Sequence, residues 1–254
     1  MTAAINGSQQ RRSALVVAAK AALVGEVKTR LCPPLTLSQA CSLYECLLED
    51  IVAKLEKCDA AELWVAFAPK GEEYFQRHFA QRTRLLTQRG GDLGKRVHHI
   101  FVDLFHLGYR EIIVTDSDSP MVPHSSIAQA FELLHGDGHD VVLGPSRDGG
   151  YYLVGLKSPT DGLFHQIPWS STAVLEKTLK RASGLGLKVA LLPVAYDIDV
   201  EQDLKRLWGD IKTSSELQQR APKTYVFLKN LFRKPGLELG EHAPLPLRDD
   251  NKRA

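Results

Sequence analysis

The chain has 254 residues, of which 44% are hydrophobic and 24% charged, a composition that excludes a wholly disordered or membrane-embedded protein. A net charge of +2 from 32 basic and 30 acidic residues argues against binding to nucleic acid or an acidic membrane. No apolar stretch reaches the roughly 20 residues of a membrane span. Recognition of phosphate groups must therefore come from local motifs.

The cysteines and the amino terminus bear on the cellular compartment. The four cysteines (Cys32, Cys41, Cys46 and Cys58) show neither CxxC spacing nor a partnering histidine cluster, so zinc and disulfide scaffolds are disfavoured. Arg11 and Arg12 precede an apolar run over residues 14–25, as in a twin-arginine export signal, but Lys20 interrupts it. The run fits a buried first strand better, and we expect a cytoplasmic protein.

Short apolar runs alternate with helical stripes along the chain. Strands are expected over residues 14–19, 63–67, 84–88, 111–115, 140–143, 151–156 and 189–192, and helices over residues 37–55, 72–79, 93–107, 125–134, 201–208 and 224–232. Such alternation predicts an α/β fold whose mostly parallel sheet carries helices on both faces. One domain over residues 13–234 is expected, between a flexible amino terminus (1–12) and a polar tail (235–254).

The sharpest chemical signal follows the strand at residues 111–115. Asp116 and Asp118 stand at alternate positions just past this strand. Mg²⁺ and Mn²⁺ prefer oxygen ligands and can bridge to phosphate, so the pair is a candidate metal site. The alternative is that Asp116 only makes an Asx turn that ends the strand.

A second acidic cluster, over residues 196–203, strengthens the metal hypothesis. It also follows a strand, and the carboxyl ends of parallel strands meet at one edge of a sheet. Asp199 is the candidate third ligand, with a helix cap as its alternative role. Asp203, four residues further on, is expected to cap the helix or form a salt bridge.

Two basic, glycine-containing segments are candidate phosphate sites. Gly25, Lys28 and Arg30 follow the first strand and combine backbone amides with two cations, or else form a solvated loop. Gly91, Asp92 and Arg96 lie where another strand leads into a helix, whose free amides could receive an anion or a base edge. Asp92 is more simply explained as the N-cap of that helix.

The segment PSRDGGYYL over residues 145–153 suggests an acceptor site between two strands that can pair as a hairpin. Asp148 is the candidate general base, and the adjacent Gly149 and Gly150 would let a ligand approach the backbone closely. A tight turn is the alternative. GxSxG, HExxH and GxGxxG motifs are lacking, which disfavours serine hydrolases, zinc peptidases and dinucleotide oxidoreductases.

In order along the chain, GEVKTRL, QRGGDLGKR, IIVTDSDSP, VVLGPSRDGGYYLVGL, LFHQIPWSS and YDIDVEQDL resemble the DUF2064 family over residues 14–232. The resemblance implies the GT-A fold, the fold of nucleotide-diphospho-sugar transferases. Family members are described as glycosyltransferases, some associated with arsenosugar biosynthesis, and they share this fold with the phospholactate and molybdenum-cofactor guanylyltransferases.

The resemblance also assigns roles to particular positions. It implies that Lys20, Lys28 and Arg30 lie at the nucleotide-phosphate end of the site. It implies that Asp118 and Asp199 bind the metal, and that Asp148 and Tyr151 face the acceptor. The family usually has glycine in place of Asp116 and proline in place of Ala22.

The expected function is therefore transfer of a sugar from a nucleoside-diphosphate donor to a small-molecule acceptor, with Mg²⁺ or Mn²⁺ as cofactor. A nucleotidyltransferase acting on a nucleoside triphosphate and a small phosphorylated acceptor is the alternative, since Lys28 and Arg30 suit a triphosphate. A non-catalytic nucleotide-binding homologue is a third reading. The base, the sugar and the oligomeric state are not indicated by the sequence.

Overall fold

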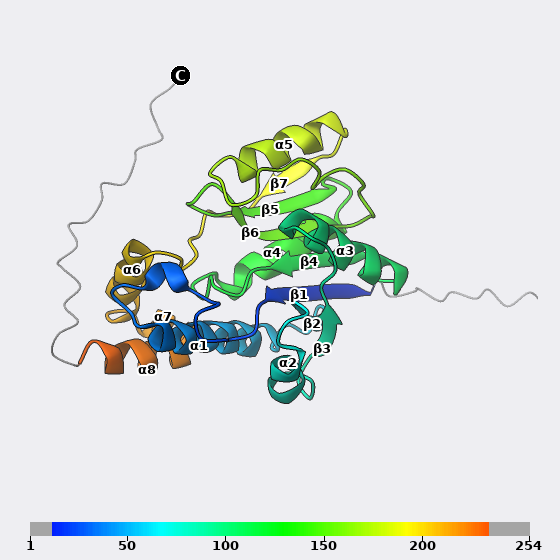
Figure 1. Ribbon diagram of the computed structural model, residues 1–254. Helices are drawn as coiled ribbons and strands as arrows, with labels where there is room; N and C mark the ends of the chain where they lie inside the picture. The colour runs from blue at the N-terminus through cyan, green and yellow to red at the C-terminus, as the bar shows by residue number, and fades with distance from the viewer. Residues whose placement is uncertain (1–11, 234–254) are drawn as a thin grey trace, which may run out of the picture.

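The computed structural model describes residues 12–233, so nearly all of the expected flexible amino terminus and the whole carboxy-terminal tail lie outside the described range. A seven-stranded sheet runs through the molecule in the order β3-β2-β1-β4-β6-β5-β7. The strands are β1 (Ser13–Ala19), β2 (Glu62–Phe67), β3 (Arg84–Thr87), β4 (Glu111–Thr115), β5 (Val141–Pro145), β6 (Tyr151–Leu156) and β7 (Val189–Leu191) (Figure 1).

Only β6 runs against its neighbours. It pairs antiparallel with both β4 and β5, whereas the other neighbouring strands are parallel. The expected hairpin-like pairing of β5 and β6 is thus confirmed. Because of the reversal, the beginning of β6 lies at the same edge of the sheet as the ends of the parallel strands. The segment around Asp148 is thereby brought to that edge.

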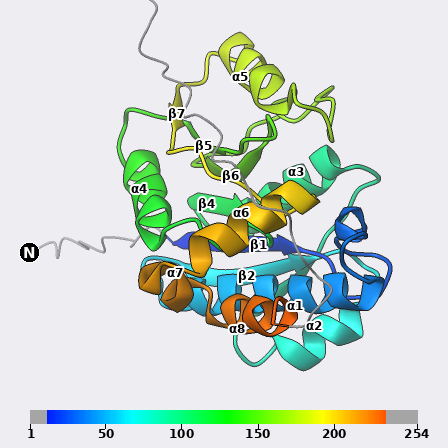
Figure 2. The same ribbon diagram turned by 90° about the vertical axis from the view of Figure 1, so that its left-hand side faces the viewer.

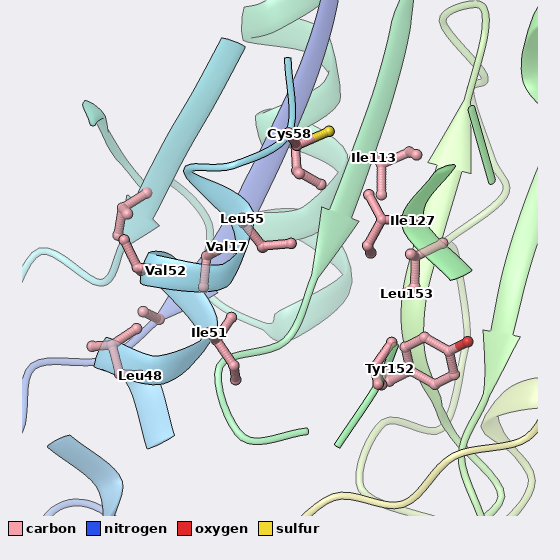
Figure 3. Packing of buried hydrophobic residues seen from close by; sticks show 14 of the residues in the cluster. Val17, Leu48, Ile51, Val52, Leu55, Cys58, Ile113, Ile127, Tyr152 and Leu153 are labelled. Carbon is pink, nitrogen blue, oxygen red and sulfur yellow. The ribbon is translucent and has the colours of Figure 1, made fainter. Parts of the chain in front are cut away.

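Helices cover both faces of the sheet. On one face α1 (Leu37–Leu55), α2 (Glu72–His78) and α4 (His124–His135) pack against side chains such as Val17 and Ile113 (Figure 3). On the other face α3 (Leu93–His106) and α5 (Val174–Gly184) pack against the alternate side chains, such as Val16 and Ile112. This alternation is the period-two pattern of a strand buried on both faces.

A third layer lies outside α1. The helices α6 (Glu201–Ile211), α7 (Ser215–Arg220) and α8 (Pro222–Leu231) follow one another, and α8 packs along α1 (Figure 2). Leu43 and Leu47 of α1 are buried here with Leu204 and Leu228. The layer brings the segment before α6, with Asp197 and Asp199, next to the loop after β1. Within the described range no helix is long and apolar enough to cross a membrane.

Side-chain caps set the start of several helices. Thr36 and Gln39 form the capping box at the start of α1. The Asp92 carboxylate accepts a hydrogen bond of 2.8 Å from the Lys95 amide at the start of α3, which confirms it as that helix's N-cap. Asp203 accepts from the amide of Val200, the N-cap residue of α6, and Asp199 is therefore not the cap.

Candidate functional site

A cavity of about 690 Å³ opens at the edge where the parallel strands end. Ten of the fourteen positions expected to carry chemistry line it: Lys20, Lys28, Arg30, Arg96, Asp116, Asp118, Asp148, Gly150, Tyr151 and Asp199. Most come from the segments after β1, β4, β5 and β7, while Arg96 lies in the first turn of α3 and Tyr151 begins β6. This is the crevice in which ligands bind in open α/β sheets.

The loop after β4 is held in shape by Asp116. One oxygen of its carboxylate accepts from the amide of Ser119 at 3.2 Å, and the other accepts from the Ser119 hydroxyl at 2.5 Å. These bonds make the Asx-type turn considered above as an alternative. Burial, and next the charge of Asp118, raises the pKa of Asp116 well above its usual range. Asp116 thus shapes the loop that presents Asp118.

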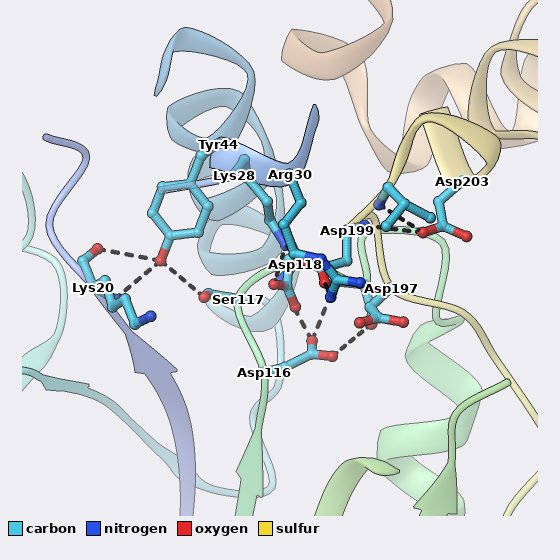
Figure 4. Close-up of polar contacts among 12 residues, drawn as sticks. Lys20, Lys28, Arg30, Tyr44, Asp116, Ser117, Asp118, Asp197, Asp199 and Asp203 are labelled. Atoms are coloured by element: carbon cyan, nitrogen blue, oxygen red, sulfur yellow. Dashed lines mark hydrogen bonds and ion pairs between the residues drawn. The ribbon is translucent and has the colours of Figure 1, made fainter. Parts of the chain in front are cut away.

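Lys28 joins the two acidic segments. Its ammonium group donates to the Asp118 carboxylate and lies 3.7 Å from an oxygen of Asp199 (Figure 4). Burial opposes the charge of Lys28, but Asp118 and Asp199 outweigh it, so its pKa is raised. Arg30 adds a 2.5 Å ion pair with Asp199 from the solvent side. The predicted convergence of Asp118 and Asp199 is therefore present, with a lysine between them.

The backbone of Lys28 explains how this side chain reaches the centre of the site. Lys28 has φ 50°, in the left-handed region, and precedes the short 3₁₀ helix η1 (Thr29–Leu31). Few residues other than glycine adopt this conformation without strain. The turn sends Lys28 inward, where only 5% of its side chain is exposed, and leaves Arg30 at the rim with 71% exposed.

Asp197 is a cavity residue that the sequence analysis did not single out. It accepts a hydrogen bond of 3.1 Å from Ser146, and burial, followed by the charges of Asp118 and Asp148, raises its pKa to about 6. Ile198 is fully buried between Asp197 and Asp199. The alternation of Asp197, Ile198 and Asp199 could have predicted that Asp197 faces the cavity together with Asp199, because an extended backbone sends residues two apart to the same side.

A divalent cation near Asp118 and Asp199 is supported by the local negative charge and not by a preformed set of ligands. No three acidic, histidine or cysteine side chains of the described residues already form a group that could hold a metal. Asp118, Asp197 and Asp199 nevertheless face the two nearby cations Lys28 and Arg30, and Asp148 adds further negative charge. Carboxylate oxygens are the ligands that Mg²⁺ and Mn²⁺ prefer. The donor types therefore suit such an ion, although Lys28 lies between Asp118 and Asp199.

A tyrosine ties the end of β1 to the loop after β4. The Tyr44 hydroxyl accepts from the Lys20 amide at 3.0 Å and lies 2.9 Å from the Ser117 hydroxyl oxygen (Figure 4). Burial raises the pKa of Tyr44 to about 12, so the group stays a neutral hydroxyl. Tyr44 belongs to the apolar stripe of α1, and its sequence pattern does not distinguish it from a core residue.

The segment after β5 divides into residues that face the cavity and one that does not. Asp148, Gly150 and Tyr151 line the cavity. Asp148 also accepts a 2.8 Å hydrogen bond from the Gly150 amide, so it closes the turn as well. Gly149 has φ +91°, and a Cβ there would lie 2.2 Å from the backbone oxygen of Thr172. Gly149 therefore serves the packing of the segment at Thr172.

The segment after β3 contributes less to the cavity than expected. Arg96 and Gln88 line it, whereas Gly91 and Asp92 do not, and Gly25 of the first basic segment also lies outside its wall. Gln88 was not among the expected residues. Its side-chain amide donates to the Ala66 carbonyl at 2.7 Å, which fixes the orientation of the side chain.

Comparisons with known proteins bear on the family and the fold. The profile of the family described as "Uncharacterized protein conserved in bacteria (DUF2064)" matches residues 51–171. The resemblance to DUF2064 is confirmed. The matched residues include the loop of Asp116 and Asp118 as well as Asp148 and Tyr151. Lys28 and Asp199 lie outside the matched range. A comparison with curated proteins finds no match.

Solved structures identify the fold. A candidate nucleotide-diphospho-sugar transferase from Desulfovibrio desulfuricans G20 is 29% identical, with a TM-score of 0.80 over 88% of this chain and 96% of that one. CMP:2-keto-3-deoxy-manno-octonic acid synthetase, solved with CTP, is 12% identical, with a TM-score of 0.52 over 79% and 98%. The chain has the nucleotide-diphospho-sugar transferase fold that the sequence predicts.

Proposed function

We propose that this DUF2064-like chain is a metal-dependent glycosyltransferase, which moves a sugar from a nucleoside diphosphate to an uncharged small-molecule acceptor. The observation that carries the proposal is the division of charge in the cavity. Its basic lining residues, Lys20, Lys28, Arg30 and Arg96, all come from the first hundred positions, where the acidic lining residue Glu26 is paired with Lys70. From Val114 onward, the charged lining residues are all aspartates.

The basic wall suits the diphosphate of a donor. Lys28 and Arg30 lie against Asp118 and Asp199, where a phosphate could take over their positive charges. Arginine binds phosphate oxygens with two parallel hydrogen bonds, and lysine acts as a point charge. Arg96 and Lys20 also line the cavity. If the diphosphate of a sugar nucleotide bound along this wall, the sugar would point toward Asp148.

Asp118 and Asp199 would hold the divalent cation, with Asp197 near enough to assist. An ion bound there would neutralise the charge that develops on the leaving diphosphate. Asp116 contributes indirectly, because both of its oxygens are engaged within the loop. Lys28 would then move from the carboxylates to the phosphate.

The lining residues of positions 146–174, here called the acceptor wall, suit an acceptor without charge. The acceptor wall presents Asp148, the half-buried ring of Trp169 and the hydroxyl-bearing residues at positions 170–172, with no cation among its described lining residues. A phosphorylated acceptor would face Asp148 and Asp197 unfavourably. Carboxylate, hydroxyl and aromatic groups together suit a polyol such as a sugar. Asp148 would accept the proton of the attacking hydroxyl group.

Nucleotidyl transfer is the second candidate. The same basic wall could hold a triphosphate, and 4-diphosphocytidyl-2C-methyl-D-erythritol synthase shares the fold at a TM-score of 0.50 and 16% identity, over 78% of this chain and 96% of that one. That likeness concerns the fold alone. The loop after β1 lacks the glycine-rich sequence of many nucleotidyltransferases, and the acceptor wall lacks the cations that a phosphorylated acceptor requires.

A product screen separates the two reactions. Purified protein would be incubated with sugar nucleotides or nucleoside triphosphates, with Mg²⁺ or Mn²⁺ and a panel of matched neutral and phosphorylated acceptors. Glycosyl transfer releases a nucleoside diphosphate, and nucleotidyl transfer releases pyrophosphate. We expect the diphosphate, and Asp148→Asn should lower transfer at least about 100-fold while donor binding stays intact. Asp137→Asn, the same change at an exposed position, should have no effect.

Release of pyrophosphate, or transfer only to phosphorylated acceptors, would replace the proposal with the second candidate. An unchanged transfer rate in Asp148→Asn would remove that residue from the mechanism.

A further inference from the structure

A second cavity of about 570 Å³ lies apart from the one described above and shares no lining residue with it. It is formed by the last turns of α1, the first turn of α4 and the junction of α7 with α8. Three basic side chains reach it: Lys54 and Lys57 from α1 and the turn after it, and Arg220 from α7. The proposed transferase reaction uses none of them.

Lys54 is a largely buried cation whose hydrogen bonds go to uncharged groups. Its ammonium group donates to the carbonyls of Val122 at 2.8 Å and Pro120 at 3.3 Å, and the described residues offer it no carboxylate within ion-pair distance. Burial lowers its pKa to about 8, despite the attraction of Asp116. A buried charge of this kind is costly unless an anion compensates it.

The other groups of the cavity favour an anion as well. Lys57 is exposed and has no ion-pair partner in the described range. The acidic lining residues are already engaged: Asp50 accepts from the amides of Lys223 and Thr224, and Glu216 pairs with Arg220 at 2.5 Å. The cationic surface of the cavity is therefore only partly neutralised by the protein.

Helix α4 supplies hydrogen-bond donors at the same place. Its N-cap is Pro123, which has no side chain able to accept from the first amides of the helix. His124 and Ser125 occupy the first turn and line the cavity, and their amides have no acceptor among the described residues. Free amides at the start of a twelve-residue helix, beside three cations, suit an anion.

We propose that this second cavity binds a phosphate group, either as free inorganic phosphate or as part of a small phosphorylated metabolite. Binding there would act on the active-site loop. Lys54 and Arg220 together hold the carbonyls of Pro120, Met121 and Val122, which directly follow the loop of Asp116 and Asp118. A phosphate competing for these donors would change how firmly that loop is held.

Amide chemical shifts of the full chain, titrated with inorganic phosphate, test the site. The His124 and Ser125 amides should shift in a saturable way, and Lys57→Gln should weaken this binding about tenfold, as the loss of one charge contact implies. Lys54→Met should weaken it at least as much. Lys70→Gln removes an exposed lysine that lines neither cavity and is the matched control, which should leave the response of His124 and Ser125 unchanged.

Shifts confined to the first cavity, or a titration unaffected by Lys57→Gln, would overturn the proposal. Lys57 is exposed, so its variant tests the site even if Lys54→Met fails to fold. Repeating the titration with a sugar phosphate in place of inorganic phosphate distinguishes the two sources: tighter binding of the sugar phosphate assigns the site to a metabolite.

Discussion

Lys28 and Asp118 are ninety positions apart in the chain, and the ammonium group of one is hydrogen-bonded to the carboxylate of the other. Both residues line the cavity, and their contact joins the loop after β1 to the loop after β4. Since Asp199 lies on the same ammonium group, three segments depend on one buried cation. The pair therefore links the stability of the fold to the organisation of the site.

Replacing Lys28 with Met should be costly, because it leaves the Asp118 charge partly buried without its partner. We expect a loss of about 2–3 kcal/mol in the free energy of unfolding, below the 3–5 kcal/mol of fully buried pairs, since a quarter of the Asp118 side chain is exposed. Urea unfolding measures this. The control Lys70→Met breaks an exposed ion pair with Glu26 and should cost less than about 1 kcal/mol.

A double-mutant cycle isolates the pair. If the contact is real, Lys28→Met combined with Asp118→Asn should be at least about 1 kcal/mol more stable than the sum of the single changes predicts. Strictly additive losses would mean that the two side chains do not interact.

Gly149 is expected to be required for folding rather than for acceptor binding. An alanine there must adopt φ +91° and would collide with the Thr172 backbone, so Gly149→Ala should cost about 2 kcal/mol or more. Gly138→Ala is the control, because a Cβ at Gly138 meets only open space and its φ is not positive. Equal melting temperatures for the two variants would contradict the close approach of Thr172.

Lys54 should make stability depend on pH in alkaline solution. Its pKa is about 8 in the fold and 10.5 ordinarily, so between these values the unfolded chain binds more protons and stability rises with pH. Below pH 8 both states are charged and the penalty, about 3 kcal/mol for a shift of this size, is fully present. Urea unfolding from pH 7 to 10 should show this rise relative to Lys54→Met. Parallel curves would refute the shift.

Much of the fold could be predicted because its central strands are continuous apolar runs buried on both faces. All seven expected strands are present, with ends that differ by at most two residues. Helix α5 was missed, since its buried stripe consists of Val174, Thr178 and Ala182. Small and polar residues of this kind give little hydrophobic periodicity. The short α7 has no buried residue at all, and so leaves no apolar pattern to detect.

The candidate site was predictable where strand ends carry charged residues, and less so elsewhere. The segments of Asp118 and Asp199 lie close together, as predicted, because parallel strands end at one edge. The sequence could not show that Lys28 lies between the carboxylates, since this depends on its left-handed backbone. Likewise, Gly149 allows a positive φ and Asp92 caps a helix, and residue type alone does not distinguish these structural roles from ligand binding.

The central claim, a nucleoside diphosphate held with a divalent cation at Asp118 and Asp199, is tested most directly by calorimetric titration of nucleoside diphosphates with and without Mn²⁺. We predict that binding requires the metal and falls at least about tenfold in Asp118→Asn, with Asp137→Asn behaving as the unaltered protein. Binding that is indifferent to Mn²⁺, or equally tight in Asp118→Asn, would contradict the account.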